Sequence, residues 1–175
     1  MLKWMPQSGV LKRSYYKRCK MKAAIKNISL KMHGFLADSM RIERHTNFDD
    51  KNIPDFTGVR VRDVARDIFE IKQPFLPLFT AKSEFNANFN ASWNQCERYL
   101  TFALDQRNYL KSEKELHFEN PRCVLLIGYN LTQEQLKSLR RKERMNPLVT
   151  VYTYNDLLVL AKSTVAFIRK HKGKS

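Results

Sequence analysis

Two short motifs in this sequence carry side chains that could do chemistry together. The first is Pro54 with Asp55, and the second is Glu70, Ile71 and Lys72 further along the chain. Carboxylate oxygens are ligands that Mg²⁺ and Mn²⁺ prefer, and a lysine beside a bound cation can orient or deprotonate a water and stabilise charge on a phosphate. Each motif alone is common by chance. The spacing by itself leaves two interpretations open, a metal site for phosphodiester hydrolysis or a charged surface hairpin.

The residues around these motifs predict how they are positioned. Residues 53–61 and 64–73 are rich in Val, Ile and Phe with near-alternation, which predicts two antiparallel strands. Because side chains alternate along a strand, Glu70 and Lys72 share one face. The side chains of Phe69 and Ile71 point to the opposite face, which is expected to face the core. Asp67 lies on that face too, so it is excluded as a metal ligand.

The register of this hairpin predicts that two carboxylates converge. A two-residue turn at residues 62–63 pairs Val61 with Val64 and Asp55 with Glu70, with Cβ atoms roughly 5 Å apart across the ladder. Two like charges side by side repel each other, and a divalent cation between them removes the repulsion. The pairing is therefore compatible with a metal site, and a charged surface hairpin remains the other interpretation.

The charge of the chain points to a polyanionic partner. The 175 residues include 32 Lys and Arg against 17 Asp and Glu, a formal net charge of +15, and this favours nucleic acid over an anionic membrane. Residues 1–37 contain no carboxylate, so they form either a solvated basic tail or an arm that follows phosphates. We therefore expect a basic N-terminal helical segment over residues 1–37 and one folded domain over residues 38–175.

Several other chemistries are excluded by what the sequence lacks. Its 5 glycines are scattered, so they build neither a P-loop nor a dinucleotide fingerprint, and no Gly-x-Ser-x-Gly elbow occurs. Its 4 histidines are solitary, which argues against a zinc site. Its 3 cysteines lack Cys-x-x-Cys spacing, which argues against a zinc knuckle or a disulfide framework and indicates a reducing cytoplasm. No apolar run approaches the length of a membrane span, so we expect a soluble cytoplasmic protein.

The remaining pattern predicts an α/β domain. Further strands are expected at residues 40–48, 123–129 and 149–154, and helices at residues 9–36, 91–114, 131–145 and 155–170. Asn90 or Ser92 can cap the second helix, a capping box opens the third, and Asn155 can cap the last. Residues 74–90 are expected to form a loop whose phenylalanines fill the core rather than stack on bases. The order of elements predicts a mixed sheet with helices on both faces.

The two motifs resemble the signature of the PD-(D/E)XK nuclease superfamily, in the literal form that gives the superfamily its name. The resemblance implies a restriction-endonuclease-like mixed sheet flanked by helices. It also implies that Asp55, Glu70 and the backbone carbonyl of Ile71 bind a catalytic Mg²⁺ or Mn²⁺, and that Lys72 serves the attacking water.

The next predicted helix adds to this resemblance. Gln95 and Tyr99 stand at i and i+4 and so share one helical face, which is similar to the Gln-x-x-x-Tyr motif of several branches of the superfamily. The resemblance implies that Gln95 holds the substrate phosphate or Lys72, and that Tyr99 binds substrate. Two positions depart from the pattern. The nearest candidate for an additional upstream glutamate is Glu43, on a predicted strand, and Gln73 stands where a basic residue is common.

The distal part of the chain narrows the resemblance. The stretches "PRCVLLIGYNLTQEQLKSL" and "VTVYTYNDLLVLA" are similar to the C-terminal half of the Shedu anti-phage nuclease domain, and the whole resemblance covers residues 52–167. It implies a metal-dependent DNA nuclease that acts in anti-phage defence as a homo-oligomer. Little base specificity is expected, because the sequence shows no module that reads bases and contacts to phosphates do not read them. The alternative that the charge also allows is a non-catalytic protein that binds DNA or structured RNA.

Overall fold

The computed structural model describes residues 40–44, 47–60 and 63–172. The predicted helix over residues 9–36, and the boundary between residues 37 and 38, therefore lie outside the described residues. No helix of the described residues is both long and apolar enough to cross a membrane.

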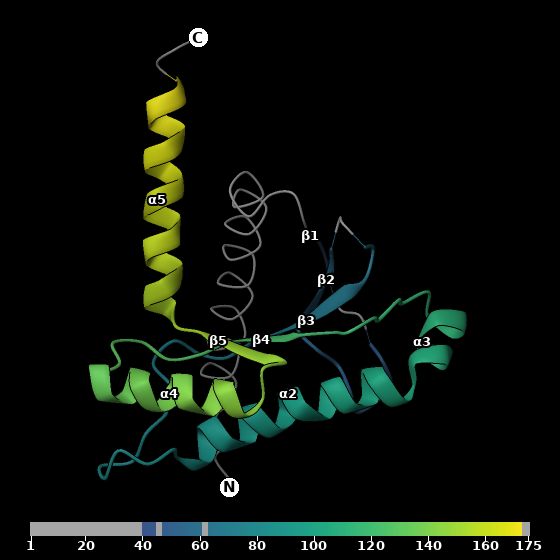
Figure 1. Ribbon diagram of the computed structural model, residues 1–175, viewed down its shortest axis with the longest axis horizontal. Coiled ribbons are helices and arrows are strands. Elements are labelled where there is room, and N and C mark those ends of the chain that lie inside the picture. The colour runs from purple at the N-terminus through teal and green to yellow at the C-terminus, as the bar shows by residue number, and fades with distance from the viewer. Residues whose placement is uncertain (1–39, 45–46, 61–62, 173–175) are drawn as a thin grey trace, which may run out of the picture.

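Five strands form one mixed sheet, which runs through the middle of the molecule in Figure 1. They are β1 (Met40–Arg44), β2 (Phe56–Arg60), β3 (Arg66–Ile71), β4 (Cys123–Leu126) and β5 (Val149–Tyr152), and they lie in sequence order across the sheet. The first three strands pair antiparallel, and β3, β4 and β5 pair parallel. The predicted mixed sheet, with antiparallel strands first and crossover strands last, is confirmed.

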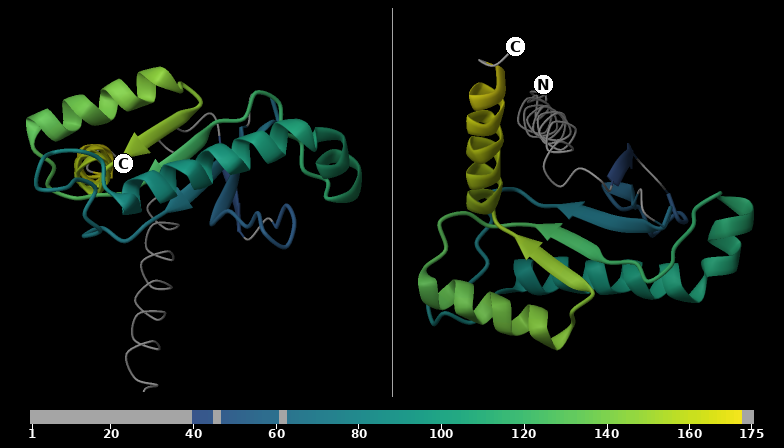
Figure 2. Two further views of the ribbon diagram at one scale, coloured as in Figure 1. Left: turned by 90° about the horizontal axis from the view of Figure 1, so that it is seen from below. Right: turned by 45° about the horizontal axis from the view of Figure 1, so that its top comes forward.

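Helices lie on both sides of this sheet, as predicted. They are α2 (Ala87–Asp105), α3 (Arg107–Glu113), α4 (Gln133–Met145) and α5 (Tyr154–Lys172). α2 and α4 lie on one side, whereas α5 projects from the other side, as both Figure 1 and Figure 2 show. Two successive crossovers that move in the same direction along a parallel sheet place their helices on the same face, which accounts for the shared side of α2 and α4. The α/β, restriction-endonuclease-like class is therefore confirmed.

The main core lies between the sheet and the helices α2 and α4. Fully buried side chains from both layers meet there, among them Ile68 of β3, Leu125 of β4, Trp93 of α2 and Leu139 of α4. Burial of such large side chains supplies most of the free energy that holds these layers together.

A smaller apolar cluster covers the opposite side of the sheet. Phe56, Ile71 and Leu126 pack there with Tyr154, which begins α5. Both faces of β3 are therefore covered. The predicted separation of Glu70 from Ile71 by strand parity is correct, but the choice of a single core-seeking face is wrong, because the Glu70 side chain is only 4% exposed on the side of the main core.

The predicted hairpin register is confirmed, and its turn is longer than predicted. Phe56 pairs with Phe69 and the ladder continues regularly along β2 and β3. The N–H of Arg60 donates to the carbonyl of Ala65 at 2.8 Å, and the N–H of Val64 donates to the carbonyl of Arg60 at 2.9 Å, so Val64 belongs to the turn and β3 begins at Arg66. Residues 61 and 62 lie outside the described residues, and the predicted Val61–Val64 pair lies there with them.

The helix predicted from residue 91 begins earlier and is interrupted. Asn86 caps α2 by accepting a hydrogen bond from the N–H of Phe89 at 3.0 Å, so neither Asn90 nor Ser92 is the cap. Phe85 stacks on Phe89 with ring centroids 4.2 Å apart, which draws these loop residues into the helix start. The interruption at Gln106 falls in the polar run of residues 105–108, where the apolar stripe of α2 ends.

The ends of β4 and α5 also differ from prediction. β4 stops at Leu126, and the backbone leaves the extended conformation at Gly128, which adopts φ +83°. A Cβ at Gly128 would lie 2.6 Å from the Leu78 side chain. The side chain of Asn155 does not cap α5. It bonds with Asn130 instead, at 2.7 Å and 3.0 Å. The predicted capping box of α4, by contrast, is present between Thr132 and Gln135.

The phenylalanines of the loop before α2 mostly fill the core, as predicted. Phe89 is fully buried, and Phe79 and Phe85 pack against the main core. Phe75 is the exception, because its side chain is 79% exposed; its ring lies edge-to-face with that of Tyr129, at 5.4 Å between centroids.

Candidate active site

The end of β3 places Glu70 and Lys72 against each other. Strand parity directs both side chains toward α2, and the Lys72 Nζ donates to Glu70 Oε1 at 2.6 Å. The Glu70 side chain is 4% exposed and that of Lys72 is 18% exposed, so the ion pair is largely shielded from water. A shielded pair interacts more strongly than a surface pair, provided that the remaining polar atoms of both groups have partners.

Gln95 provides the second partner of Lys72. Gln95 Oε1 accepts from Lys72 Nζ at 2.7 Å, and Gln95 Nε2 donates to the Tyr99 hydroxyl at 2.5 Å. The Tyr99 hydroxyl in turn donates to the backbone carbonyl of Ile53 at 3.0 Å. A carbonyl can only accept, so Tyr99 must donate to it, and this leaves its oxygen to accept from Gln95. This series of hydrogen bonds therefore has one direction, and that direction turns the amide oxygen of Gln95 toward the ammonium of Lys72.

Tyr99 supports Gln95 from within the core. The sequence predicts a substrate-binding role for Tyr99, yet its side chain is buried, with 1% exposure. Burial raises the pKa of Tyr99, and the charge of Glu70 raises it further, so the hydroxyl stays protonated and keeps its role as a donor. The geometry thus places Tyr99 beneath Gln95 and away from any surface that a substrate could reach.

Asp55 lies at the same end of β3. It directly precedes β2, one step beyond the paired residues Phe56 and Phe69, so the register carries it opposite Glu70. Its Oδ2 accepts from the N–H of Ile71 at 2.9 Å. The carboxylate of Asp55 is therefore held at the peptide that joins Glu70 to Ile71, which is the peptide between the two predicted metal-binding residues.

The loop before Asp55 is itself fixed to α2. Asp49 accepts from the N–H and from the side-chain amide of Asn52, at 2.5 Å and 2.9 Å. Asn52 Oδ1 then accepts from Arg98 Nε at 3.2 Å, one residue away from Tyr99 on α2. Both ends of the candidate site, the loop and the end of β3, are thus tied to the same helix.

One buried oxygen of Glu70 is an acceptor that a divalent cation would satisfy. Glu70 Oε2 is fully shielded from solvent and has no hydrogen-bond partner among the described residues. A buried, unpartnered carboxylate oxygen costs free energy, on the order of 1 to 3 kcal/mol, unless a cation or a donor reaches it. Carboxylate and carbonyl oxygens are the donors that Mg²⁺ and Mn²⁺ take, so Asp55, Glu70 and the Ile71 carbonyl make a suitable set.

This set contains two carboxylates. Among residues 40–44, 47–60 and 63–172 no group of three or more His, Cys, Asp or Glu side chains is arranged to hold a metal. Glu43, the upstream candidate, pairs through its backbone with Thr57 in β1.

A contact that the sequence does not reveal holds the backbone of Lys72. The hydroxyl of Tyr154 donates to the carbonyl of Lys72 at 2.5 Å, and the N–H of Lys72 donates to the carbonyl of Leu126 at 2.9 Å. Lys72 is thus anchored by its N–H, its carbonyl and its ammonium. Tyr154 is 82 residues away in the chain, and its position at the start of a helix gives no signal that would link it to Lys72.

Asp67 lies apart from this set, and the two described cysteines are buried residues of the core. Asp67 accepts from the N–H of Arg122 at 2.9 Å and from Arg60 at 3.4 Å on the other face of β3, which agrees with its exclusion by parity. Cys96 and Cys123 are free and fully buried. A hydrogen bond with Cys96 and burial hold the pKa of Cys123 well above its usual value, so this thiol is not a nucleophile.

The mixed sheet, its flanking helices and the set of polar residues at the end of its central strand are those of a restriction-endonuclease-like domain. The family model for the C-terminal region of the Shedu protein SduA matches residues 19–158. The chain therefore belongs to the Shedu family. No curated protein matches it.

Proposed function

We propose that this protein is a Mg²⁺-dependent deoxyribonuclease of the PD-(D/E)XK type, which hydrolyses phosphodiester bonds in anti-phage defence. The observation that carries the proposal is the buried, unpartnered Oε2 of Glu70, beside a carboxylate on one side and a fixed lysine on the other. A charged surface hairpin does not account for this atom, because a solvated carboxylate would have water around both oxygens. Membership of the Shedu family supports the same function.

The chain's own residues have distinct roles in this proposal. Asp55, Glu70 and the Ile71 carbonyl would hold the cation, which when bound supplies a Lewis acid for the phosphate and lowers the pKa of a coordinated water. Lys72 has three N–H donors, and Glu70 and Gln95 accept two of them. The third is directed by these two bonds and is left to bind the attacking water or a phosphate oxygen.

Gln95 and Tyr99 keep Lys72 in place. The chain of donors that ends at the Ile53 carbonyl allows only one orientation of the Gln95 amide. A catalytic group that is already oriented does not lose conformational entropy during the reaction, so its stabilisation of the developing charge is larger. We therefore assign Tyr99 a positioning role through Gln95.

We also propose that the substrate is DNA gripped through its backbone, with little base specificity, and that the protein acts as a homo-oligomer. The net charge of +15 supports the first statement, because contacts to phosphates position a duplex without reading its sequence. Exposed apolar side chains on α5 support the second, since Leu158 is 48% and Val159 is 65% exposed.

The test compares degradation of linear duplex DNA by the wild type and by Lys72→Ala, with and without Mg²⁺. We expect Mg²⁺-dependent cleavage by the wild type and a loss on the order of 100-fold or more in Lys72→Ala. Lys111→Ala, on the exposed surface of α3, is the matched control and should cleave normally. If the wild type and Lys72→Ala are equally inactive with every divalent cation while DNA still binds, the protein is a non-catalytic DNA-binding protein and the proposal fails.

A further inference from the structure

Helix α4 presents four cations on its outward side. Lys137, Arg140, Arg141 and Arg144 stand at i, i+3, i+4 and i+7, which places them on one face, and all four are exposed. Leu139, on the opposite side of the helix, is fully buried in the main core. We call these four residues the α4 basic stripe.

The acids of α4 leave most of this charge uncompensated. Glu134 lies in the first turn of the helix, and Glu143 is turned toward the sheet edge. Glu143 Oε1 accepts from the N–H of Val151 at 2.6 Å and its Oε2 pairs with Arg140 at 2.7 Å, which raises the pKa of Arg140. Within the part of the chain that the structure describes, no acid pairs with the other three cations of the stripe.

Helix stability alone does not account for the stripe. Cations in the last turn of a helix interact favourably with its macrodipole, and this explains Arg144 and the neighbouring Lys142. Lys137 and Arg141 lie further from the C-terminal end of α4. At these positions the helix macrodipole does not stabilise a cation, or it destabilises it. Like charges at i and i+4 repel each other, so the pair has a cost that a polyanionic partner would remove.

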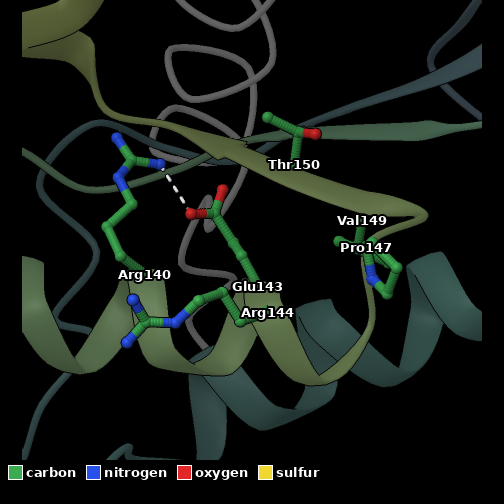
Figure 3. A pocket seen from close by; sticks show the side chains of 6 residues that line it. All are labelled: Arg140, Glu143, Arg144, Pro147, Val149 and Thr150. Carbon is green, nitrogen blue, oxygen red and sulfur yellow. Dashed lines mark hydrogen bonds and ion pairs between the residues drawn. The ribbon is translucent and has the colours of Figure 1, made fainter.

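A groove lies beside the α4 basic stripe. It has a volume of about 360 Å³ and lies between the end of α4 and β5. Figure 3 shows Arg140 and Glu143 reaching from α4 toward β5, with Arg144 beside them and Thr150 on the strand. Arg140 is engaged with Glu143 and the Val151 carbonyl, whereas Arg144 has no acid partner among the described residues. The guanidinium group of Arg144 therefore offers a planar pair of donors that matches two oxygens of a phosphate at the edge of this groove.

The stripe and the candidate active site lie on the same side of the sheet. α4 is attached to α2, because Lys142 Nζ lies over the Trp93 ring at 5.1 Å and Asn146 Nδ2 donates to Glu97 Oε1 at 3.1 Å. α2 also carries Gln95, which accepts from Lys72 at 2.7 Å, so the candidate site and α4 are attached to the same helix. These contacts hold the two surfaces in a fixed relation.

We propose that the α4 basic stripe binds the phosphate backbone of duplex DNA away from the candidate active site, and so holds the duplex whose strand enters that site. Seven residues of helix span about 10 Å, which corresponds to roughly three successive phosphates along one strand. The identification of the polyanion as DNA rests on the proposed function. Binding of this kind is independent of base sequence.

The test measures binding of a labelled linear duplex in EDTA by fluorescence anisotropy over a range of salt concentrations. The full chain is compared with the double variant Lys137→Gln/Arg141→Gln, which removes two cations that no described acid pairs with. Arg140 is left intact because it donates to the Val151 carbonyl at 2.9 Å and supports β5. We expect the slope of log affinity against log salt to fall by about two and the affinity to fall on the order of tenfold near 0.1 M salt.

The matched control is Lys111→Gln/Lys114→Gln, which removes the same charge from exposed positions at the far end of α3. This control should keep the wild-type slope. The inference is overturned if both double variants bind alike, if the wild type binds no duplex, or if the stripe matters for structured RNA or anionic vesicles and not for DNA.

The outcomes separate this inference from the proposed function. Stripe-dependent binding of the duplex without Mg²⁺-dependent cleavage retains the stripe and rejects the nuclease. Cleavage that depends on Lys72, with binding unaffected by the stripe variant, retains the nuclease and rejects the stripe.

Discussion

Divalent cations should stabilise this protein through Glu70, and a conservative substitution should abolish the effect. Glu70→Gln keeps the oxygen that accepts from Lys72 at 2.6 Å and replaces the unpartnered Oε2 with an amide nitrogen. An amide nitrogen donates hydrogen bonds and does not bind a hard cation. The variant therefore tests the cation site while it changes the shape of the side chain little.

The expected magnitude follows from linkage between binding and folding. A cation that binds only the folded state at roughly ten times its Kd adds about 1.4 kcal/mol to the free energy of unfolding. For a chain of this length, that corresponds to an increase of about 3 to 6 °C in Tm. Thermal unfolding is followed in EDTA and in Mg²⁺ or Mn²⁺, at matched ionic strength because the chain carries a net charge of +15.

The matched control is Glu119→Gln, which makes the same charge change at a side chain that is 60% exposed. We expect the wild type and Glu119→Gln to show the full increase in Tm and Glu70→Gln to show less than about 1 °C. An equal increase in all three proteins, or none in the wild type, refutes the assignment of Glu70 Oε2 as a cation ligand.

Two further predictions concern the surroundings of this site, and a third concerns Asp67 on the other face of β3. Gln95→Ala removes an acceptor of Lys72, so we expect kcat for DNA cleavage to fall on the order of 10- to 100-fold with DNA affinity unchanged. Tyr154→Phe keeps the packed ring and removes the donor to the Lys72 carbonyl, so single-turnover cleavage should slow on the order of tenfold with little change in Tm. Burial raises the pKa of Asp67 above 3.8, so its ionisation lowers stability as pH rises from about 4 through that raised value. Asp67→Asn keeps an acceptor for the N–H of Arg122, and urea unfolding at a series of pH values should show a smaller loss of stability over this range than in the wild type.

The hairpin could be predicted from the sequence because its information is local. Alternation of apolar residues fixes which side chains share a face, and the pairing of Phe56 with Phe69 then determines the position of Asp55 relative to Glu70. The turn was less predictable, since it lacks a Gly or Asn. Asp63 substitutes for them by accepting from the N–H of Ala65 at 3.2 Å.

The burial of the site could not be predicted in this way. Which side of β3 meets α2 depends on the path of the crossover, so the sequence left Glu70 on an apparently open face, although its side chain is 4% exposed. The early start of α2 has a similar cause. Stacking of Phe85 on Phe89 is a tertiary contact, and it outweighs the local signals for a cap at Asn90.

The hydrogen bond between Tyr154 and the Lys72 carbonyl could not be predicted from the motif. The motif contains the side chains that we propose act on a substrate, whereas the hydroxyl that holds the Lys72 carbonyl comes from the beginning of the last helix, 82 residues later. Only the parallel pairing of β3 with β4, and of β4 with β5, brings these residues together.

The central claim is that Asp55 and Glu70 hold one divalent cation beside Lys72. Anomalous diffraction from crystals of the full chain soaked in Mn²⁺ tests it most directly. We expect a peak at about 2.0 to 2.3 Å from Glu70 Oε2 that also contacts the carboxylate of Asp55 and the carbonyl of Ile71. Mn²⁺ bound only elsewhere, at a concentration that supports DNA cleavage, contradicts the claim.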